Sequence, residues 1–226
     1  MTSTFSAVVL ANTNSEILGI KNSAEILAHE SISRAVVYSS AATHIIVGVN
    51  FSLNGNVVGT QVLEEVLIKY LPSTRGALAS LGLLLDLVPE DLPVLIVPTN
   101  SWIEESLEDF VDLMIIDNAD VGLVVVKSNS PDLSYVRYVG DNIVEIHEKE
   151  VISEYAISGH FFFRNKKVIL DCLDWAMLNN INKDGLLYIA PSLNFGITKG
   201  MKVASYRADH EKYTHTRQIR GVTYGV

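Results

Sequence analysis

The hydrophobic positions of the chain fall into short apolar runs that alternate with stretches of helical periodicity. The first run, Ser6–Ala11, is apolar at nearly every position, which is typical of a strand buried on both faces. This pattern predicts strands at Ser6–Ala11, His44–Val49, Val94–Val97, Val121–Lys127, Tyr135–Val139, Ile143–His147, Ala156–Phe163 and Lys202–Arg207. It predicts helices at Ala24–Ser40, Gly76–Val88, Ile103–Asn118, Lys166–Asn179 and Gly185–Ile197.

The order of these elements predicts an α/β fold class. Strand, helix and strand alternate early in the chain, which favours a mainly parallel sheet covered by helices on both faces. The stretch from Val121 to Phe163 is rich in strands with short gaps, so we expect an antiparallel or mixed insertion in the same sheet. No repeat and no Pro-, Gly- or Ser-rich linker divides the chain, and we expect a single domain over residues 1–226.

Composition narrows the possible partners and the location. The formal net charge is −9, which argues against broad nucleic-acid binding and against docking on anionic membranes. The one cysteine, Cys172, rules out an internal disulfide and fits a reducing compartment. No secretory signal and no apolar run long enough to span a membrane is present. The expected location is therefore cytoplasmic.

Candidate chemistry gathers in the segments that follow the predicted strands. Ligands of open α/β sheets bind beyond the carboxyl ends of the strands, which directs attention to Asn12–Glu16, Pro98–Trp102 and the segment around Glu148–Lys149. The turn Asn12–Glu16 stands where many α/β proteins hold phosphate. It contains neither a glycine nor a cation, and phosphate loops usually need both.

Several motifs occur in the order found in one enzyme family. A turn leads to Gly76 and an apolar helix, a strand is followed by PTNSWI, and the segments VEIHEKE and AISGHFFF come later. Over about Ser73 to Gly200, this series resembles the sugar-phosphate nucleotidyltransferases, of the glucose-1-phosphate thymidylyltransferase type. The resemblance implies a three-layer GT-A-like fold with a mainly parallel, mixed central sheet. It also implies attack of a sugar phosphate on a nucleoside triphosphate, with Mg²⁺ held by Asp.

The parts that would handle triphosphate and metal depart from the family pattern. The family loop contains two glycines and ends in Arg, whereas this chain has Asn12, Asn14 and Glu16 at the matching positions. Asn tolerates the left-handed conformation, so the turn shape can survive, but a carboxylate repels a triphosphate. The family strand ends in Gly-Asp, and this chain has Thr99-Asn100 there. The late metal-binding Asp of the family has no convincing match in EKYTHTRQI.

The sugar side of the family motif is better preserved. Glu148 and Lys149 resemble the Glu-Lys pair, whose Glu meets sugar hydroxyls and whose Lys meets the sugar phosphate in the family. Ser158 and Gly159 resemble the strand on which the sugar rests. These four are the predicted substrate-binding residues. The predicted nucleotide-binding residues are Ala11, Asn12, Asn14, Arg75, Gly76 and Asn100. No catalytic residue and no metal ligand is assigned.

Structural interpretations of the same residues stay open. Glu148 and Lys149 also suit a solvated turn, and a glycine within a strand, such as Gly159, often marks a bulge. Asn100 and Ser101 also suit the N-cap of a helix that begins at Ile103.

Three functional hypotheses follow, and enzymatic activity is left open. The preferred one is a divergent nucleotidyltransferase-like protein with lost or altered triphosphate and metal chemistry, a pseudoenzyme that binds a sugar phosphate, a nucleotide sugar or a partner enzyme. The second is an active nucleotidyltransferase of surface-polysaccharide synthesis, in which Lys21, Arg75 and Lys149 supply charge and Mg²⁺ is the cofactor. The third is a GT-A glycosyltransferase, although a clear Asp-x-Asp motif is missing. A homo-oligomer is expected from the resemblance.

Overall fold

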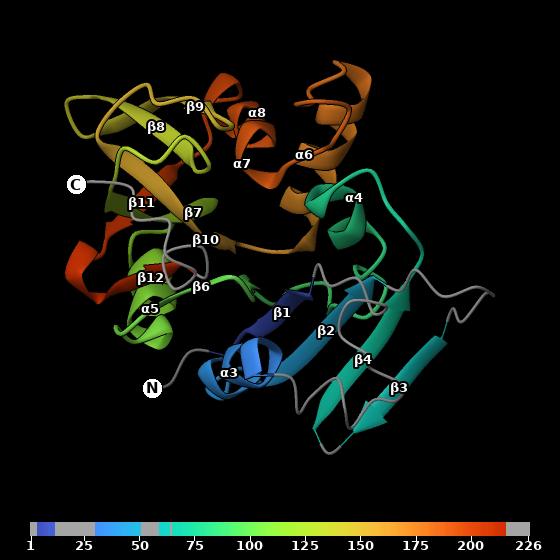
Figure 1. Ribbon diagram of the computed structural model, residues 1–226. Helices are drawn as coiled ribbons and strands as arrows, with labels where there is room; N and C mark the ends of the chain where they lie inside the picture. The colour runs from blue at the N-terminus through green and yellow to red at the C-terminus, as the bar shows by residue number, and fades with distance from the viewer. Residues whose placement is uncertain (1–3, 12–29, 51–58, 64, 216–226) are drawn as a thin grey trace.

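A ten-stranded mixed sheet forms the centre of the molecule (Figure 1). The structure is a computed structural model that describes residues 4–11, 30–50, 59–63 and 65–215. The main path of the sheet has the order β11-β7-β10-β5-β1-β2-β4-β3, and β8 and β9 join it through β10. Its strands are β1 (Ser6–Ala11), β2 (His44–Asn50), β3 (Gly59–Leu63), β4 (Val66–Leu71), β5 (Val94–Pro98), β7 (Val121–Lys127), β8 (Ser134–Val139), β9 (Asn142–His147), β10 (Tyr155–Phe163) and β11 (Val203–Arg207). A second sheet pairs β6 (Ser101–Ile103) with β12 (Tyr213–His215).

The predicted fold class is confirmed. β1 pairs in parallel with both β2 and β5, and β2 pairs in parallel with β4. β10 runs antiparallel to β5 and β7 and carries the β8–β9 hairpin on its edge. The strand-rich middle of the sequence therefore forms an antiparallel part of the same sheet, and β3 adds a second one by pairing antiparallel with β4.

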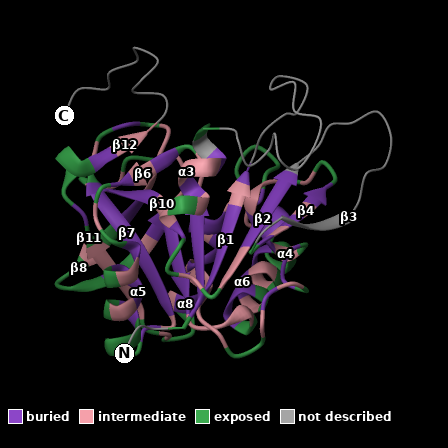
Figure 2. Ribbon diagram, turned by 90° about the horizontal axis from the view of Figure 1, so that it is seen from below, coloured by how far each residue is buried: buried purple, intermediate pink, exposed green. Residues whose placement is uncertain are grey.

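Helices cover both faces of the sheet, which explains the continuous apolar runs. One face is packed by α3 (Glu30–Tyr38) and α5 (Leu107–Ile116), and the other by α4 (Ala77–Gly82), α6 (Lys166–Leu178), α7 (Ile189–Ser192) and α8 (Asn194–Thr198). In β1, Val9 belongs to the first core cluster and Val8 to the second. Figure 2 shows the central strands as buried along most of their length.

Several predicted helix boundaries are wrong. The helix expected at Gly76–Val88 ends at Gly82, and the chain then continues in turns with hydrogen bonds between residues three apart, such as Leu84 N–H to Leu81 O. The helix expected at Gly185–Ile197 is two short helices, α7 and α8. The segment before them turns at Asp184–Gly185, and Leu187 is held out of a helix by backbone hydrogen bonds to Arg75 and to Leu78.

The acidic helix begins later than predicted. Ser101–Ile103 is strand β6, and α5 begins at Leu107 with Ser106 as its N-cap, whose Oγ accepts a hydrogen bond from Asp109 N–H at 3.3 Å. The hydroxyl of Ser101 is therefore free for another role. Of the helix predicted at Ala24–Ser40, residues 24–29 lie outside the described residues. No helix among the residues that the structure describes is long and apolar enough to cross a membrane.

The Gly76 turn provides a test of how closely two backbone segments approach. Gly76 has φ +108°, and a Cβ added to it would lie 2.4 Å from the carbonyl oxygen of Leu187. Gly76→Ala should therefore lower the free energy of unfolding by about 2–4 kcal/mol, measured by urea denaturation. Gly140→Ala is the matched control, because Gly140 has φ +60° and nothing within 4 Å of an added Cβ. We expect a loss of about 1 kcal/mol there; equal losses would contradict the crowding.

Candidate functional site

A cavity of about 430 Å³ opens beyond the carboxyl ends of β1 and β5, where an α/β sheet places its ligand. It is lined by segments that lie far apart in the sequence. The lining residues are Leu10, Ala77, Ile96, Pro98, Thr99, Asn100, Ser101, Asp132, Leu133, Ser134, Glu148, Lys149, Ile157, Ser158, Gly159, Phe161, Tyr188, Ile189, Ala190 and His215. All four predicted substrate-binding residues line this one cavity. Their binding of a sugar phosphate stays a prediction.

Glu148 is placed by the register of the β8–β9 hairpin. Tyr135 pairs with His147, so the next residues outward, Ser134 and Glu148, face each other at the open end. Ser134 Oγ donates a 2.5 Å hydrogen bond to Glu148 Oε2. Burial raises the pKa of Glu148, against the opposing effects of this hydrogen bond and of Lys149. The carboxylate is thus partly desolvated and has a free oxygen that can accept a ligand hydroxyl.

Lys149 is held with its ammonium group at the cavity wall. It has φ +52°, a left-handed conformation that is uncommon for a residue with a side chain. Its Nζ donates a 2.8 Å hydrogen bond to Tyr188 Oη and lies 4.7 Å from the centroid of the same ring. The hydrogen bond to Tyr188 raises the pKa of Lys149, so the group carries a positive charge at neutral pH.

A β-bulge brings Ser158 and Gly159 into the cavity. The pairing of β10 with β7 shifts register between Ile157 and Phe161, and Gly159 within this interval has φ +95°. An added Cβ at Gly159 would lie 3.2 Å from Pro98 Cγ. The bulge and the close packing both account for the glycine, so the structural interpretation of Gly159 is satisfied, and the same bulge exposes its backbone to a ligand.

A network of buried polar side chains holds the backbone of the bulge. Ser158 Oγ and His160 Nδ1 lie 2.9 Å apart, and Ser101 Oγ donates a 2.6 Å hydrogen bond to Ser158 O. Burial lowers the pKa of His160 to about 3, so its ring is neutral. Its Nε2 is buried without a hydrogen-bond partner among the described residues. A neutral, buried imidazole orients Ser158 and is a poor base at neutral pH.

Ion pairs form among the charged residues that flank Glu148 and Lys149. His147 Nε2 lies 2.5 Å from Glu145 Oε1, and His147 Nδ1 lies 3.1 Å from Glu150 Oε2. Arg137 pairs with Glu145 at 2.6 Å. The hydrogen bond to Glu150, together with the contact to Glu145, raises the pKa of His147. His147 and Glu150 pair with each other outside the lining, whereas Glu148 and Lys149, for which a solvated turn was the alternative, line the cavity.

The predicted nucleotide-binding residues are distributed differently. Asn100 lines the cavity. Ala11 is buried in the core cluster beneath α3 and α5, and Asn12 and Asn14 lie outside the described residues. Gly76 forms the turn before α4, next to Ala77 of the cavity wall.

Arg75 does not line this cavity. It lies in a second cleft, on the other side of the Gly76 turn. Its predicted contact with a nucleotide phosphate thus has no support from the cavity that holds Lys149.

Sequence reasoning missed His215, Asp132 and Tyr188. His215 reaches the lining because β12 pairs with β6, with His215 opposite Ser101. A strand of three residues leaves no readable periodicity. Tyr188 was assigned to a helix interior, although it precedes α7 as its N-cap. Asp132 lies in the turn before β8, and the only available signal was its place between two predicted strands.

The described residues do not fit an Mg²⁺ site of the kind that the family resemblance implies. Asn100 stands where the family motif carries Asp, the late Asp of the family has no convincing match in this chain, and the lining carboxylates are Asp132 and Glu148. Within the described part of the chain, no group of three or more His, Cys, Asp or Glu residues is arranged to hold a metal ion. Mg²⁺ depends on carboxylate ligands together with substrate phosphates. We therefore derive no step through a metal.

Solved structures with the same fold were found by comparison. A nucleoside-diphosphate-sugar pyrophosphorylase from Vibrio cholerae RC9 superposes with a TM-score of 0.69 at 17% identity, over 94% of this chain and 95% of that one. A Bacillus anthracis protein assigned as a glucose-1-phosphate thymidylyltransferase, in complex with sucrose, gives 0.66 at 16% identity, over 99% and 98%. The inositol-1-phosphate CTP transferase from T. maritima gives 0.64 at 15% identity, over 94% and 89%. No protein-family model and no curated protein sequence matches the chain.

These likenesses define the class of protein at the level of fold. The molecule is a mixed α/β protein with a mostly parallel central sheet and the architecture of nucleotidyltransferases. More particularly, it has the fold of the sugar-phosphate nucleotidyltransferases, at the low identity of a divergent sequence. The resemblance stated from the sequence motifs is thereby confirmed for the fold.

The pKa values of His147 and His160 should be shifted in opposite directions from the ordinary histidine value, which NMR titration can measure. The pKa of His147 should lie above its ordinary value and fall in Glu150→Gln, whereas Glu154→Gln, whose partner is Lys127, should leave it unchanged. Because the folded-state pKa is raised, the stabilisation is fully present below the unfolded pKa of about 6.5 and is lost as the pH rises through the folded-state value. His160 should remain neutral down to about pH 3; its protonation near pH 6 would contradict its burial.

Proposed function

We propose that this protein binds a sugar phosphate, or the sugar-phosphate end of a nucleotide sugar, in the cavity around Glu148 and Lys149. In this proposal the triphosphate and metal chemistry of the nucleotidyltransferase fold is lost or altered. The proposal places a hexose-sized polyol beside Glu148 and the β10 bulge, with its phosphate on Lys149.

The observation that carries the proposal is the charge of the described lining. Lys149 is its one permanent cation, and the lining also carries the carboxylates of Asp132 and Glu148. A nucleoside triphosphate carries about four negative charges at neutral pH and requires several cations or a metal. A lysine held by Tyr188 suits one phosphate group.

The neutral part of the lining suits a sugar. Hydroxyl groups of Ser101, Ser134 and Ser158 and the amide of Asn100 accompany the free oxygen of Glu148. A sugar presents a ring of hydroxyls that both donate and accept hydrogen bonds, and a buried site rejects molecules that leave such groups unpaired. The left-handed backbone of Lys149 and Gly159 is consistent with strain kept at a ligand site.

Substitution of Lys149 tests the proposal directly. Lys149→Met should weaken the binding of glucose 1-phosphate at least about tenfold, because it removes the charge-assisted hydrogen bond to the phosphate. Isothermal titration calorimetry measures this effect, and unphosphorylated glucose should bind with similar, weak affinity to both proteins. Lys167→Met is the matched control, since Lys167 is an exposed lysine of α6 that pairs with Asp171.

The other ligands of the panel separate the alternatives. Mg²⁺-dependent binding of a nucleoside triphosphate would contradict the loss of triphosphate chemistry and favour an active nucleotidyltransferase. If nucleotide sugars bind and sugar phosphates do not, the nucleotide part must contribute to binding. That outcome would contradict a site limited to the sugar-phosphate end. If no member of the panel binds, the small-molecule function is wrong, and association with a partner enzyme takes its place.

A further inference from the structure

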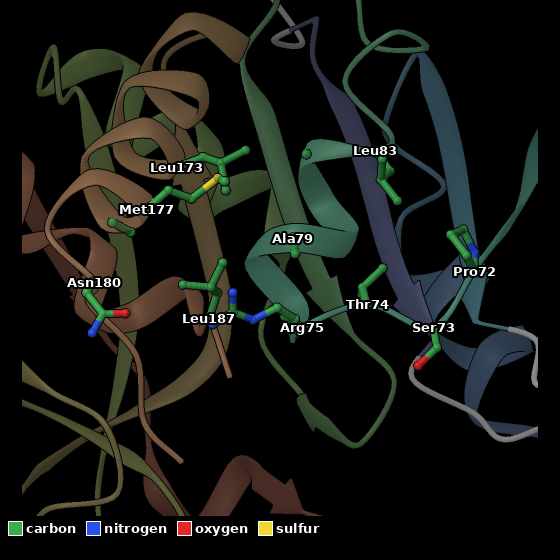
Figure 3. Close-up of a pocket in the computed structure, with 12 residues that line it drawn as sticks. Pro72, Ser73, Thr74, Arg75, Ala79, Leu83, Leu173, Met177, Asn180 and Leu187 are labelled. Atoms are coloured by element: carbon green, nitrogen blue, oxygen red, sulfur yellow. The ribbon is translucent and has the colours of Figure 1, made fainter. Parts of the chain in front are cut away.

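A second cleft, of about 500 Å³, lies on the other side of the Gly76 turn. Figure 3 shows Ala79 of α4 between two groups of lining residues, with Leu173 and Met177 of α6 on one side and Pro72–Thr74 on the other. The complete lining is Pro72, Ser73, Thr74, Arg75, Ala79, Gly82, Leu83, Leu173, Ala176, Met177, Asn180 and Leu187. None of these residues lines the cavity of Glu148 and Lys149.

The surface of this cleft is mostly apolar and remains open to solvent. Leu83 and Met177, which line it, are 44% and 62% exposed. Leaving two such apolar side chains in water is unfavourable. A volume of this size falls in the range of small-molecule sites. The cleft therefore suits the apolar body of a small ligand.

The charge of the cleft identifies the polar end of that ligand. Arg75 is its one charged side chain, and it forms no salt bridge with any described carboxylate. Its Nε donates a long, 3.4 Å hydrogen bond to Gly185 O, and its terminal nitrogens make no hydrogen bond to a described residue. In a chain of net charge −9, an arginine without a carboxylate partner beside an apolar cleft favours an anion with an apolar tail.

Hydrogen bonds hold the backbone of the wall behind Arg75. Leu187 N–H donates to Arg75 O at 2.6 Å, and Leu78 N–H donates to Leu187 O at 3.1 Å. Thr74 Oγ1 and Ser80 Oγ, 2.6 Å apart, tie the turn to α4. A ligand that enters a preformed cleft loses less affinity to ordering of the protein.

We propose that this cleft binds a small amphipathic monoanion, with its apolar body against α4 and α6 and its anionic group on Arg75. The site is separate from the proposed sugar-phosphate site. Either proposal can fail while the other holds, because no lining residue is shared.

Binding of decanoate, below its micelle concentration, tests the proposal by calorimetry on the full chain. Decanoate should bind at least tenfold more tightly than decan-1-ol, which has the same chain without the charge. Arg75→Gln should remove that difference by weakening decanoate about tenfold and leaving decan-1-ol unchanged. Arg207→Gln is the matched control, because Arg207 lies on β11 and stacks on Tyr138 and Tyr155, outside the cleft.

Two further variants test the apolar body. Ala79→Leu fills the floor of the cleft and should weaken both probes. Met177→Asp, at an exposed position, should weaken the binding of decanoate more than that of decan-1-ol. This variant replaces Ala79→Leu in the test if circular dichroism shows that Ala79→Leu does not fold. The proposal is overturned if decanoate does not bind at millimolar concentration, if it binds no better than decan-1-ol, or if Arg75→Gln and Met177→Asp leave its affinity unchanged.

Discussion

The join between the Gly76 turn and Leu187 is the contact on which both cavities of this molecule depend. Its two backbone hydrogen bonds require the chains to approach so closely that position 76 has no room for a side chain. On one side of the join, Ala77 and Tyr188 face Lys149; on the other, Arg75 and Leu187 face α6. Gly76, a predicted nucleotide-binding residue, is required here by the packing of the fold as well. Its contact with a nucleotide stays a prediction.

The sequence predicted most of the strands whose pattern burial sets, although it missed β4, and it predicted poorly where a contact between distant segments decides. β1, β7 and β10 are buried on both faces, and their apolar runs predict these strands. β6 and β12 are three residues each and exist because they pair with each other. The helix predicted at Gly185–Ile197 fails for the same reason, since Leu187 is drawn into backbone hydrogen bonds with a turn more than a hundred residues earlier. Such contacts have no local signal.

The residues of the candidate site also divide into those with a local signal in the sequence and those without one. Glu148, Lys149, Ser158 and Gly159 were readable because they follow one another in motifs at a strand end and within a strand. Tyr188 and His215 reach the cavity through contacts between distant segments, whereas Asp132 lies in the turn before β8. Tyr188 fixes the ammonium of Lys149, and His215 stands beside the strand end that carries Asn100. The turn Asn12–Glu16, on which the loss of triphosphate chemistry was argued, lies outside the described residues. The charge of the described lining is therefore an independent argument for that loss.

The two cavities differ in how the protein holds its cation, and this difference explains why they suit different ligands. Lys149 hydrogen-bonds to Tyr188 in a lining that also carries Asp132, Glu148 and several hydroxyls. A ligand there must satisfy many polar groups, because an unpaired buried donor or acceptor costs about 1–3 kcal/mol. Arg75 stands almost alone beside leucine and methionine side chains, where hydroxyl groups would lose their water without replacement. The proposed ligands, a sugar phosphate on one side of Leu187–Tyr188 and an amphipathic anion on the other, follow from this difference in lining.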